Sequence, residues 1–362
     1  MDLYFIVTND LSYDQRMIRI GTSLAGQGYT VHLVGRKLKT SIPLANQSFL
    51  QKRIPCLFTK GKFFYAELNA RLFFYLLFKK MDCICAIDLD TILPCYFISK
   101  IKKIPRVYDA HELFCEMKEV VSRPAIYRFW KRIEKFAVPK FVHGYTVSQP
   151  IADSFKQMYN VHYNVIRNMA VKKELPIREK KEKYILYQGA VNEGRSFETI
   201  IPAMKGVDLP LVICGDGNFM PQAKQLTAAY GLENKITFKG YVPPEELQQY
   251  TVNAWIGINL VDSEGLNNYY SLANRYFDYM HAGLPQLCID LAGYREINEQ
   301  FEIAVLISDI SAENIAAQIQ RLLNDETFVK RLQLNCLSAR EIFNWQQEEK
   351  KLIALYKKLL PG

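Results

Sequence analysis

The sequence predicts an α/β protein with two doubly wound, parallel-sheet domains that face each other across a cleft. The chain has 362 residues, which is too long for one ordinary core and fits two domains. In each half, short apolar strands alternate with helical stretches, a pattern typical of a parallel sheet covered by helices on both faces. A charged stretch at 171–183, without an apolar period, separates the halves and is interpreted as the linker.

The first domain is expected to comprise residues 1–170. A helix is expected from about Asp14 to Gly26, after the first strand. The expected strands are short apolar runs, and they lie at 3–8, 30–35, 83–88, 106–110 and 144–148.

The second domain is expected at 184–342 and repeats the pattern. Helices are expected from about Phe197, up to Tyr230 and at 271–285, and the closing stretch at about 343–362 is also helical in pattern. The expected strands lie at 184–189, 209–215, 235–240, 254–260 and 286–291. Because ligands of open parallel sheets bind beyond the carboxyl ends of the strands, the loops at these ends are the first places to look for a site.

Composition excludes a disordered or fibrous chain, since 49% of the residues are hydrophobic and there are 22 Tyr and 21 Phe. Charge is uneven: residues 1–170 hold 25 Lys and Arg against 13 Asp and Glu, and the remainder holds 21 against 24. This asymmetry indicates that the first domain faces something anionic.

The eight cysteines lie mostly within apolar runs and form no metal-binding spacing, so we expect free thiols of a reducing compartment. The first residues, MDLYFIVTND, lack the pattern of a signal peptide, and the longest apolar run, at 72–78, is too short to span a membrane. We therefore expect a cytoplasmic protein, with membrane association as an open alternative.

The helix expected at 271–285 carries a candidate ligand site. It begins at Ser271, and its spacings are expected to place Asn274, Arg275 and Asp278 on one polar face near its start. Backbone N–H groups and Arg275 suit an anion, and Asp278 suits neutral hydroxyls. A nucleotide diphosphate with its ribose offers both, whereas an ordinary capped surface helix is the alternative.

Five stretches of the chain, in their order and spacing, resemble the glycosyltransferases of the GT-B architecture, and among these the retaining family 4, or glycosyl transferases group 1. They lie at 7–36, 107–114, 187–204, 213–217 and 271–285. The stretch at 343–359 is similar to the family's closing helix, which crosses back onto the first domain, so the first domain is expected to include about 343–362. The resemblance implies two Rossmann-like domains, with a nucleotide-sugar donor held by the second and an acceptor by the first.

The resemblance also implies roles for individual residues. Arg195 and Arg275 would clamp the diphosphate, His111 would contact the transferred sugar, and Asp278 would bind the ribose. Further donor contacts are implied at Asn9, Asp10, Arg16, Gly189, Gly215, Gly217, Tyr241, Val242, Glu264, Ser271 and Asn274. In the usual proposal for retaining enzymes the leaving diphosphate takes the acceptor proton, so no strong protein base is needed. No cofactor and no metal ion are expected.

The sequence departs from the family pattern at two positions. Tyr270 stands where many members have a Glu, and Asp278 is one methylene shorter than the Glu of relatives. Glu264 is a candidate substitute for the first Glu, with an exposed loop carboxylate as the alternative. A solvated loop charge is the alternative for Arg195, and a structural role for His111.

Several other patterns have simpler readings. Asp14 and Arg16 can cap the first helix and pair, and the glycines of CGDG lack the third glycine of a dinucleotide fingerprint. Asp88 and Asp90 form a DxD pattern, interpreted as a loop cap. The His111–Glu112 pair is not a zinc motif, since Cys115 stands where the second His would be.

Residues 60–80 combine aromatic and aliphatic side chains with Lys60, Lys62, Lys79 and Lys80. A core helix is the default interpretation. The alternative is a helix that contacts an anionic membrane, which fits a lipid-linked acceptor.

The predicted function is transfer of a sugar from a nucleotide-sugar donor to an acceptor hydroxyl with retention, in the synthesis of a surface polysaccharide or lipid-linked glycan. Alternatives are a non-hydrolysing nucleotide-sugar epimerase of the same fold and an inactive binding or scaffold subunit. No nucleic-acid-binding motif supports a nucleic-acid partner.

Overall fold

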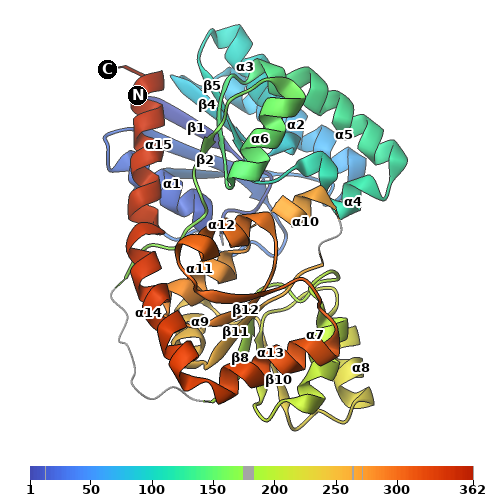
Figure 1. Cartoon of the computed structure of the whole chain (residues 1–362). Helices are drawn as coiled ribbons and strands as arrows, with labels where there is room; N and C mark the ends of the chain where they lie inside the picture. Colours follow the sequence, from blue (N-terminus) through green and yellow to red (C-terminus); the bar gives the residue numbers. More distant parts are fainter. Residues whose placement is uncertain (13, 174–182, 263–264, 271, 362) are drawn as a thin grey trace. The chain divides into compact units, whose positions relative to one another are not determined.

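A computed structural model describes residues 1–12, 14–173, 183–262, 265–270 and 272–361, which form two compact units (Figure 1). Unit 1 comprises Met1–Asn168, Gly265–Asn267 and Trp345–Gly362, and unit 2 comprises Met169–Glu264 and Asn268–Asn344. Each unit has its own parallel sheet flanked by helices, so the predicted fold class is confirmed. Most of the predicted linker, residues 174–182, lies outside the described residues.

The sheet of unit 1 has seven parallel strands in the order β3-β2-β1-β4-β5-β6-β7. They are β1 (Asp2–Ile6), β2 (Thr30–Lys37), β3 (Leu50–Pro55), β4 (Cys83–Ile87), β5 (Arg106–Ala110), β6 (His143–Thr146) and β7 (Asn164–Val165). The α-helices are α1 (Gln15–Ala25), α2 (Gly61–Leu77), α3 (Ile92–Lys102), α4 (Lys118–Val121), α5 (Pro124–Ala137), α6 (Gln149–Tyr159) and α15 (Trp345–Leu359). Single 3₁₀ turns lie at Leu89–Thr91, Phe114–Glu116 and Val138–Lys140.

The sheet of unit 2 has six parallel strands in the order β10-β9-β8-β11-β12-β13. They are β8 (Ile185–Gln188), β9 (Leu211–Cys214), β10 (Ile236–Gly240), β11 (Ile256–Asn259), β12 (Gln286–Ile289) and β13 (Ala304–Ile307). The helices are α7 (Phe197–Ala203), α8 (Met220–Ala229), α9 (Pro244–Asn253), α11 (Asn274–His281), α12 (Ala292–Gln300), α13 (Ala312–Asn324) and α14 (Glu326–Ile342), with a 3₁₀ turn at Met204–Gly206. The short α10 (Leu266–Tyr270) begins in unit 1 and ends in unit 2.

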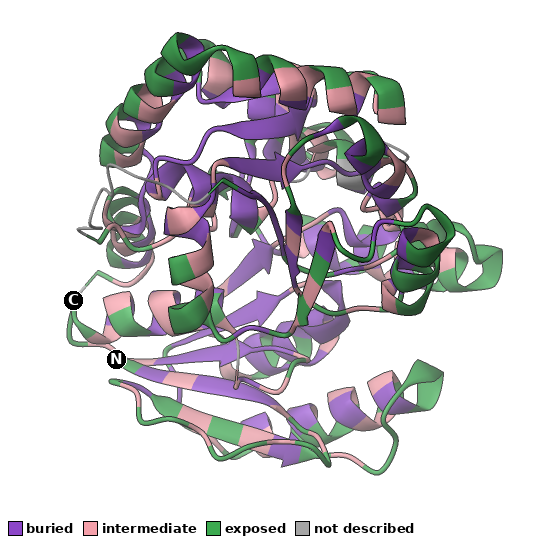
Figure 2. Ribbon diagram, turned by 90° about the horizontal axis from the view of Figure 1, so that it is seen from below, coloured by how far each residue is buried: buried purple, intermediate pink, exposed green. Residues whose placement is uncertain are grey.

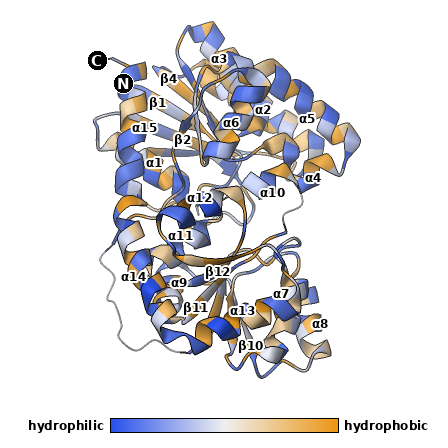
Figure 3. Ribbon diagram, in the orientation of Figure 1, coloured by the Kyte–Doolittle hydropathy of each residue, from blue (hydrophilic) through white to orange (hydrophobic). Residues whose placement is uncertain are grey.

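All ten predicted strands occur, each shifted by no more than a few residues, and the structure adds β3, β7 and β13. The predicted strands are apolar because the central strands of a parallel sheet are buried on both faces. Figure 2 shows most of them in the purple of buried residues, and Figure 3 shows them largely in the orange of apolar side chains. β3 (LQKRIP) escaped prediction because it is a polar edge strand.

Each sheet has a point at which the strand order reverses, and such points are the usual ligand sites of doubly wound sheets. In unit 1, β1 lies between β2 and β4, and in unit 2, β8 lies between β9 and β11. The loops that follow β8 and β11 therefore leave the second sheet in opposite directions. The side chains at the strand ends of each unit are described below, one unit at a time.

The helix α15 belongs to the core of unit 1 although it follows all of unit 2 in the chain. Its Trp345, Leu352 and Tyr356 pack into the cluster that contains Phe5 of β1, and α15 lies beside α1 (Figure 1). The Trp345 indole N–H donates to the Ser23 hydroxyl at 2.9 Å.

No helix in the described part of the chain combines the length and the apolar character needed to cross a membrane. All eight cysteines are free, as predicted.

The buried side chain of Leu352 provides a test of the contribution of α15. Leu352 is 0% exposed, so Leu352→Ala should lower the free energy of unfolding by about 2–5 kcal/mol through lost burial and a cavity. Leu57→Ala, at a position in the same unit that is 80% exposed, should change it by less than about 0.5 kcal/mol. Urea denaturation measures both, and equal effects would contradict the packing role of α15.

Candidate active site

Arg275 is a buried cation at the point where the strand order of unit 2 reverses. It is 6% exposed. Its Nε donates to Asn259 Oδ1 at 2.8 Å, and its Nη1 donates to the Tyr187 hydroxyl at 2.9 Å and to the Gln188 carbonyl at 3.2 Å. These partners lie at the carboxyl ends of β8 and β11, so the guanidinium connects the two strands.

The partners of Arg275 are all neutral. Among the described residues, no carboxylate forms an ion pair with it and its Nη2 has no hydrogen-bond partner. The guanidinium also lies over the Tyr187 ring, 4.6 Å from its centre. An arginine cannot lose its charge in a protein, and a buried charge without a counter-ion is costly. The arrangement is therefore suited to an anionic ligand.

The glycines predicted for the site allow two loops of unit 2 to lie close together. A Cβ on Gly189, which has a φ of 122°, would lie 3.0 Å from Arg275 Nη1, and one on Gly215 would lie 1.8 Å from the Gly189 carbonyl oxygen. A Cβ on Gly217 would lie 2.3 Å from the Val191 carbonyl oxygen. The loops after β8 and β9 thus require glycine for their own packing next to Arg275.

Helix α11 differs in part from the prediction. It begins at Asn274, with Ala273 as its N-cap and no capping side chain, and Ser271 lies outside the described residues, as does Glu264. Asn274 is exposed whereas Arg275 is buried. The expectation that both lie on one polar face is wrong, because Arg275 turns into the unit toward the strand ends.

Asp278, one turn after Arg275, is half-buried. Its Oδ2 accepts a hydrogen bond of 3.0 Å from the Gln188 amide. Asp278 and Arg275 are thus both bonded to Gln188, the last residue of β8.

Three further predicted residues lie in the loops of unit 2. Arg195 is half-buried in the loop that leads into α7. Tyr241 and Val242 follow β10, where Tyr241 is 60% exposed and Val242 is buried.

In unit 1 a charge network joins α1 to the end of β5. Arg16 is buried and donates to both oxygens of the buried Asp109, with Nη2 to Oδ1 at 2.9 Å and Nε to Oδ2 at 3.3 Å. Asp14 caps α1 by accepting from the Met17 backbone N–H at 2.9 Å. Asp14 therefore caps α1, as considered above. Arg16 forms an ion pair, and its partner is Asp109.

His111 lies between two carboxylates. Its Nε2 is 3.1 Å from Asp109 Oδ2, an ion-pair contact without hydrogen-bond geometry, and its Nδ1 is 3.4 Å from Asp88 Oδ2. Burial alone lowers the pKa of His111, but the charges of Asp109 and Asp88 more than offset this and raise it to about 9. His111 is therefore a cation at neutral pH.

The DxD residues are bonded to protein groups. Asp88 Oδ1 accepts from the His111 backbone N–H at 3.0 Å, which fits its interpretation as a loop cap. Asp90 is buried and accepts from the Thr8 hydroxyl at 2.8 Å. Burial and the nearby Asp88 raise the pKa of Asp90 to about 7.

Asn9 and Asp10 hold the loop after β1. The Asn9 amide donates to Asp14 Oδ2 at 2.6 Å. Asp10 accepts from the hydroxyls of Ser12 and Ser41, and from Arg53 Nη2 at 3.1 Å. These bonds fix the loop that joins β1 to α1.

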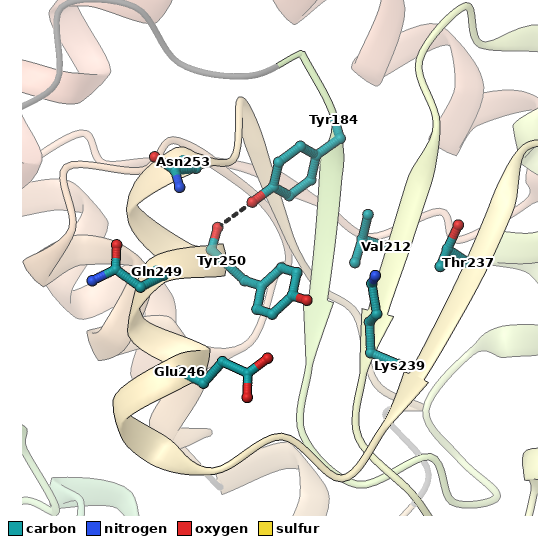
Figure 4. A pocket seen from close by; sticks show the side chains of 8 residues that line it. All are labelled: Tyr184, Val212, Thr237, Lys239, Glu246, Gln249, Tyr250 and Asn253. Carbon is teal, nitrogen blue, oxygen red and sulfur yellow. Dashed lines mark hydrogen bonds between the residues drawn. The ribbon is translucent and has the colours of Figure 1, made fainter.

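Unit 2 also has a hollow of about 390 Å³ between α9 and strands β8 to β10 (Figure 4). The Tyr184 hydroxyl donates to the Tyr250 carbonyl at 2.6 Å at its edge. As far as the described residues go, its lining contains none of the predicted site residues; it consists of Tyr184, Val212, Thr237, Lys239, Glu246, Gln249, Tyr250 and Asn253.

The sequence analysis did not identify the residues that form hydrogen bonds or ion pairs with the predicted site residues. Tyr187, Gln188 and Asn259 around Arg275 and Asp109 beside His111 were not singled out. The available signal was a polar residue at the end of an apolar strand, as in ILYQ and IGIN, or one residue before the end, as in RVYDA.

The two parallel-sheet units define a GT-B protein, and comparison with solved structures agrees. Sucrose-phosphate synthase from Thermosynechococcus elongatus superposes with a TM-score of 0.83 at 16% identity, covering 99% of both chains. Anabaena HepE in complex with UDP and glucose has a TM-score of 0.76 at 14% identity, again covering 99% of both. WaaG, a glycosyltransferase involved in lipopolysaccharide biosynthesis, has a TM-score of 0.74 at 14% identity, covering 99% of this chain and all of that one.

The sequence comparisons cover about half of the chain. The family model Glycosyl transferases group 1 matches residues 170–336. An uncharacterized glycosyltransferase of Methanocaldococcus jannaschii is 24% identical over 181 residues, which span 49% of this chain and 45% of that relative. Residues 170–336 are thus similar to the glycosyl transferases group 1 family.

The charge of His111 gives a pH-dependent prediction. A histidine whose folded pKa is about 9 stabilises the fold fully below its unfolded pKa of about 6.5, and this contribution is lost as pH rises through about 9. Asp88→Asn should lower the pKa of His111, because one of the two carboxylates is neutralised. NMR titration of the imidazole signal, assigned through its loss in His111→Gln, measures the shift.

The matched control is Asp153→Asn, which neutralises an exposed carboxylate on α6. It should leave the titration of His111 unchanged. A His111 pKa near 6.5 in the wild type would contradict the ion-pair arrangement.

Proposed function

We propose that this protein is a glycosyltransferase that moves a sugar from a nucleoside-diphosphate sugar to an acceptor hydroxyl. The observation that carries the proposal is Arg275, a buried guanidinium with neutral partners at the strand-order reversal of unit 2, within the residues similar to group 1. A diphosphate supplies the negative charge that this environment lacks. The charge that grows on the leaving diphosphate would be stabilised in the same way.

The proposed donor site extends from Arg275 to its neighbours. Arg195 is proposed as a second diphosphate contact, and Asp278 as the acceptor of ribose hydrogen bonds. The complexes of HepE with UDP, with UDP and glucose and with UDP-glucose support a nucleotide-sugar donor.

We propose that transfer occurs with retention and needs no metal ion. An inverting reaction requires a general base for the acceptor hydroxyl, and His111 is unsuited to that role because its pKa is raised to about 9. As a cation it would instead stabilise negative charge or contact the sugar. Asp88 Oδ1 and Asp90 Oδ2 already accept hydrogen bonds from His111 and Thr8, which supports a reaction without a metal at the DxD pattern.

The acceptor is proposed to be a glycan or a lipid-linked glycan of a surface polysaccharide. The involvement of WaaG in lipopolysaccharide biosynthesis supports this class. So does the excess of Lys and Arg over Asp and Glu in residues 1–170.

Peripheral contact with an anionic membrane from the cytoplasmic side, through residues 60–80, is part of the proposal. One face of α2 packs into unit 1 through Phe64, Leu68, Leu72 and Leu76. Other α2 side chains are exposed, with Phe63 at 60% and Phe74 at 62%, and Phe78 just after the helix is 82% exposed. Exposed aromatics beside lysines favour the interface of an anionic bilayer.

Loss of Arg275 tests the donor site. Calorimetry with the nucleoside diphosphate that gives the largest thermal shift in a panel of UDP, GDP, ADP and CDP should show binding to the wild type. Arg275→Ala should weaken it by about 2 kcal/mol or more, roughly 30-fold, because a charge-assisted contact is lost.

Arg295→Ala is the matched control, since Arg295 is an arginine of the same unit, half exposed and paired with Asp290 at 2.9 Å. It should leave binding unchanged. Undiminished binding by a folded Arg275→Ala would refute the assigned role of Arg275, and absence of nucleotide binding by the wild type would refute the proposed activity.

The membrane proposal predicts salt-sensitive vesicle binding. The wild type should float with vesicles containing phosphatidylglycerol but not with pure phosphatidylcholine. Phe63→Ser combined with Phe74→Ser should reduce flotation about tenfold or more, because burial of each ring contributes roughly 1.5–3 kcal/mol. Leu334→Ser, at a position of unit 2 that is 66% exposed, should have no effect, and equal flotation of all three proteins would contradict this contact.

A further inference from the structure

A chain of hydrogen bonds through three elements of unit 2 includes Asp278. The Thr251 hydroxyl of α9 shares its one proton between Gln188 Oε1 at 2.7 Å and the Leu247 carbonyl of its own helix at 2.9 Å. Gln188 Nε2 of β8 donates to Asp278 Oδ2 of α11 at 3.0 Å. Gln188 and Thr251 are 3% and 4% exposed. Water therefore has little access to this chain.

The chemistry of the groups fixes the orientation of the Gln188 amide. The Asp278 carboxylate, when ionised, only accepts hydrogen bonds, so the NH₂ group must face it. The amide oxygen then faces Thr251, whose hydroxyl donates to it. With the amide reversed, two oxygens would face each other at Asp278.

A buried glutamine at the end of an apolar strand needs an explanation, because its amide is costly to bury unless both ends are bonded. An apolar side chain would fill the ILYQ strand end without that cost. The main chain of Gln188 is engaged as well, since its carbonyl accepts from Arg275 and its N–H donates to the Tyr279 hydroxyl at 3.1 Å. One residue thus holds the cation through its backbone and the carboxylate through its side chain.

We propose that Gln188 is a positioning residue that orients Asp278 and thereby makes the donor site select ribose over 2′-deoxyribose. The inference rests on the nucleotide-sugar donor proposed above. Asp278 has few side-chain torsions, so a hydrogen bond at one oxygen fixes the direction of the other. A fixed acceptor favours a ligand that places a hydroxyl opposite it, and the diphosphate contact of Arg275 is independent of that hydroxyl.

The experiment compares each ribonucleoside diphosphate with its 2′-deoxy counterpart, for UDP, GDP, ADP and CDP, by calorimetry on the full chain. With the base that binds tightest, the wild type should prefer the ribose form by about 10- to 100-fold, the range expected for a hydrogen bond to a charged group. In Gln188→Leu the preference should fall below about threefold. Binding of inorganic pyrophosphate should stay within about twofold of the wild type, which separates lost positioning from misfolding.

Thr251→Val tests the outer link and also serves if Gln188→Leu does not fold. It should lower the ribose preference by several fold. The matched control is Thr227→Val, because Thr227 is an equally buried threonine whose hydroxyl donates to the Ala223 carbonyl of its own helix at 2.9 Å. This control should keep the wild-type preference.

The outcomes distinguish the two proposals. If the wild type binds no nucleoside diphosphate, the proposed function fails. If it binds without preferring ribose, or if a folded Gln188→Leu or Thr251→Val keeps the full preference, the positioning role is overturned while the donor site stands. A ribose preference lost together with pyrophosphate binding would also overturn it.

Discussion

The organisation of unit 2 depends on holding one positive charge at the diverging ends of β8 and β11. The Arg275 guanidinium cannot be neutralised by losing a proton, so its surroundings must provide oxygen atoms and an aromatic face. Tyr187, Gln188 and Asn259 provide them from the two strand ends. A glycine is favoured at position 189, because a Cβ there would lie only 3.0 Å from Arg275 Nη1. The local sequence is thus explained by one buried cation.

The fold was largely predictable because the central strands are apolar on both faces, and such runs are conspicuous in a sequence. The edge strands were less predictable. The β3 sequence LQKRIP alternates weakly and carries charge, and β7 has only two residues, too few for a period. Edge strands face water on one side, so their composition approaches that of a loop.

The site was predictable only in part. The helix pattern singled out Arg275 and Asp278, and the family resemblance added His111. Neither indicated the burial of Arg275 or the carboxylates on both sides of His111. The supporting side chains come from positions distant in the sequence; for example, Arg275 and Tyr187 are 88 residues apart. A polar residue at a strand end has no periodicity, so its partner can be found only when the topology brings the strand ends together.

The place of α15 in the core of unit 1 has a consequence for folding during synthesis on the ribosome. A ribosome releases the strands of the first sheet early, but Trp345, Leu352 and Tyr356 emerge only after all of unit 2. Unit 2 is continuous in the chain except for a few residues, so it can fold while unit 1 still exposes the apolar surface that α15 will cover. Unit 1 is thus synthesised first but completed last, and chaperones have the longest time to bind its exposed apolar surface.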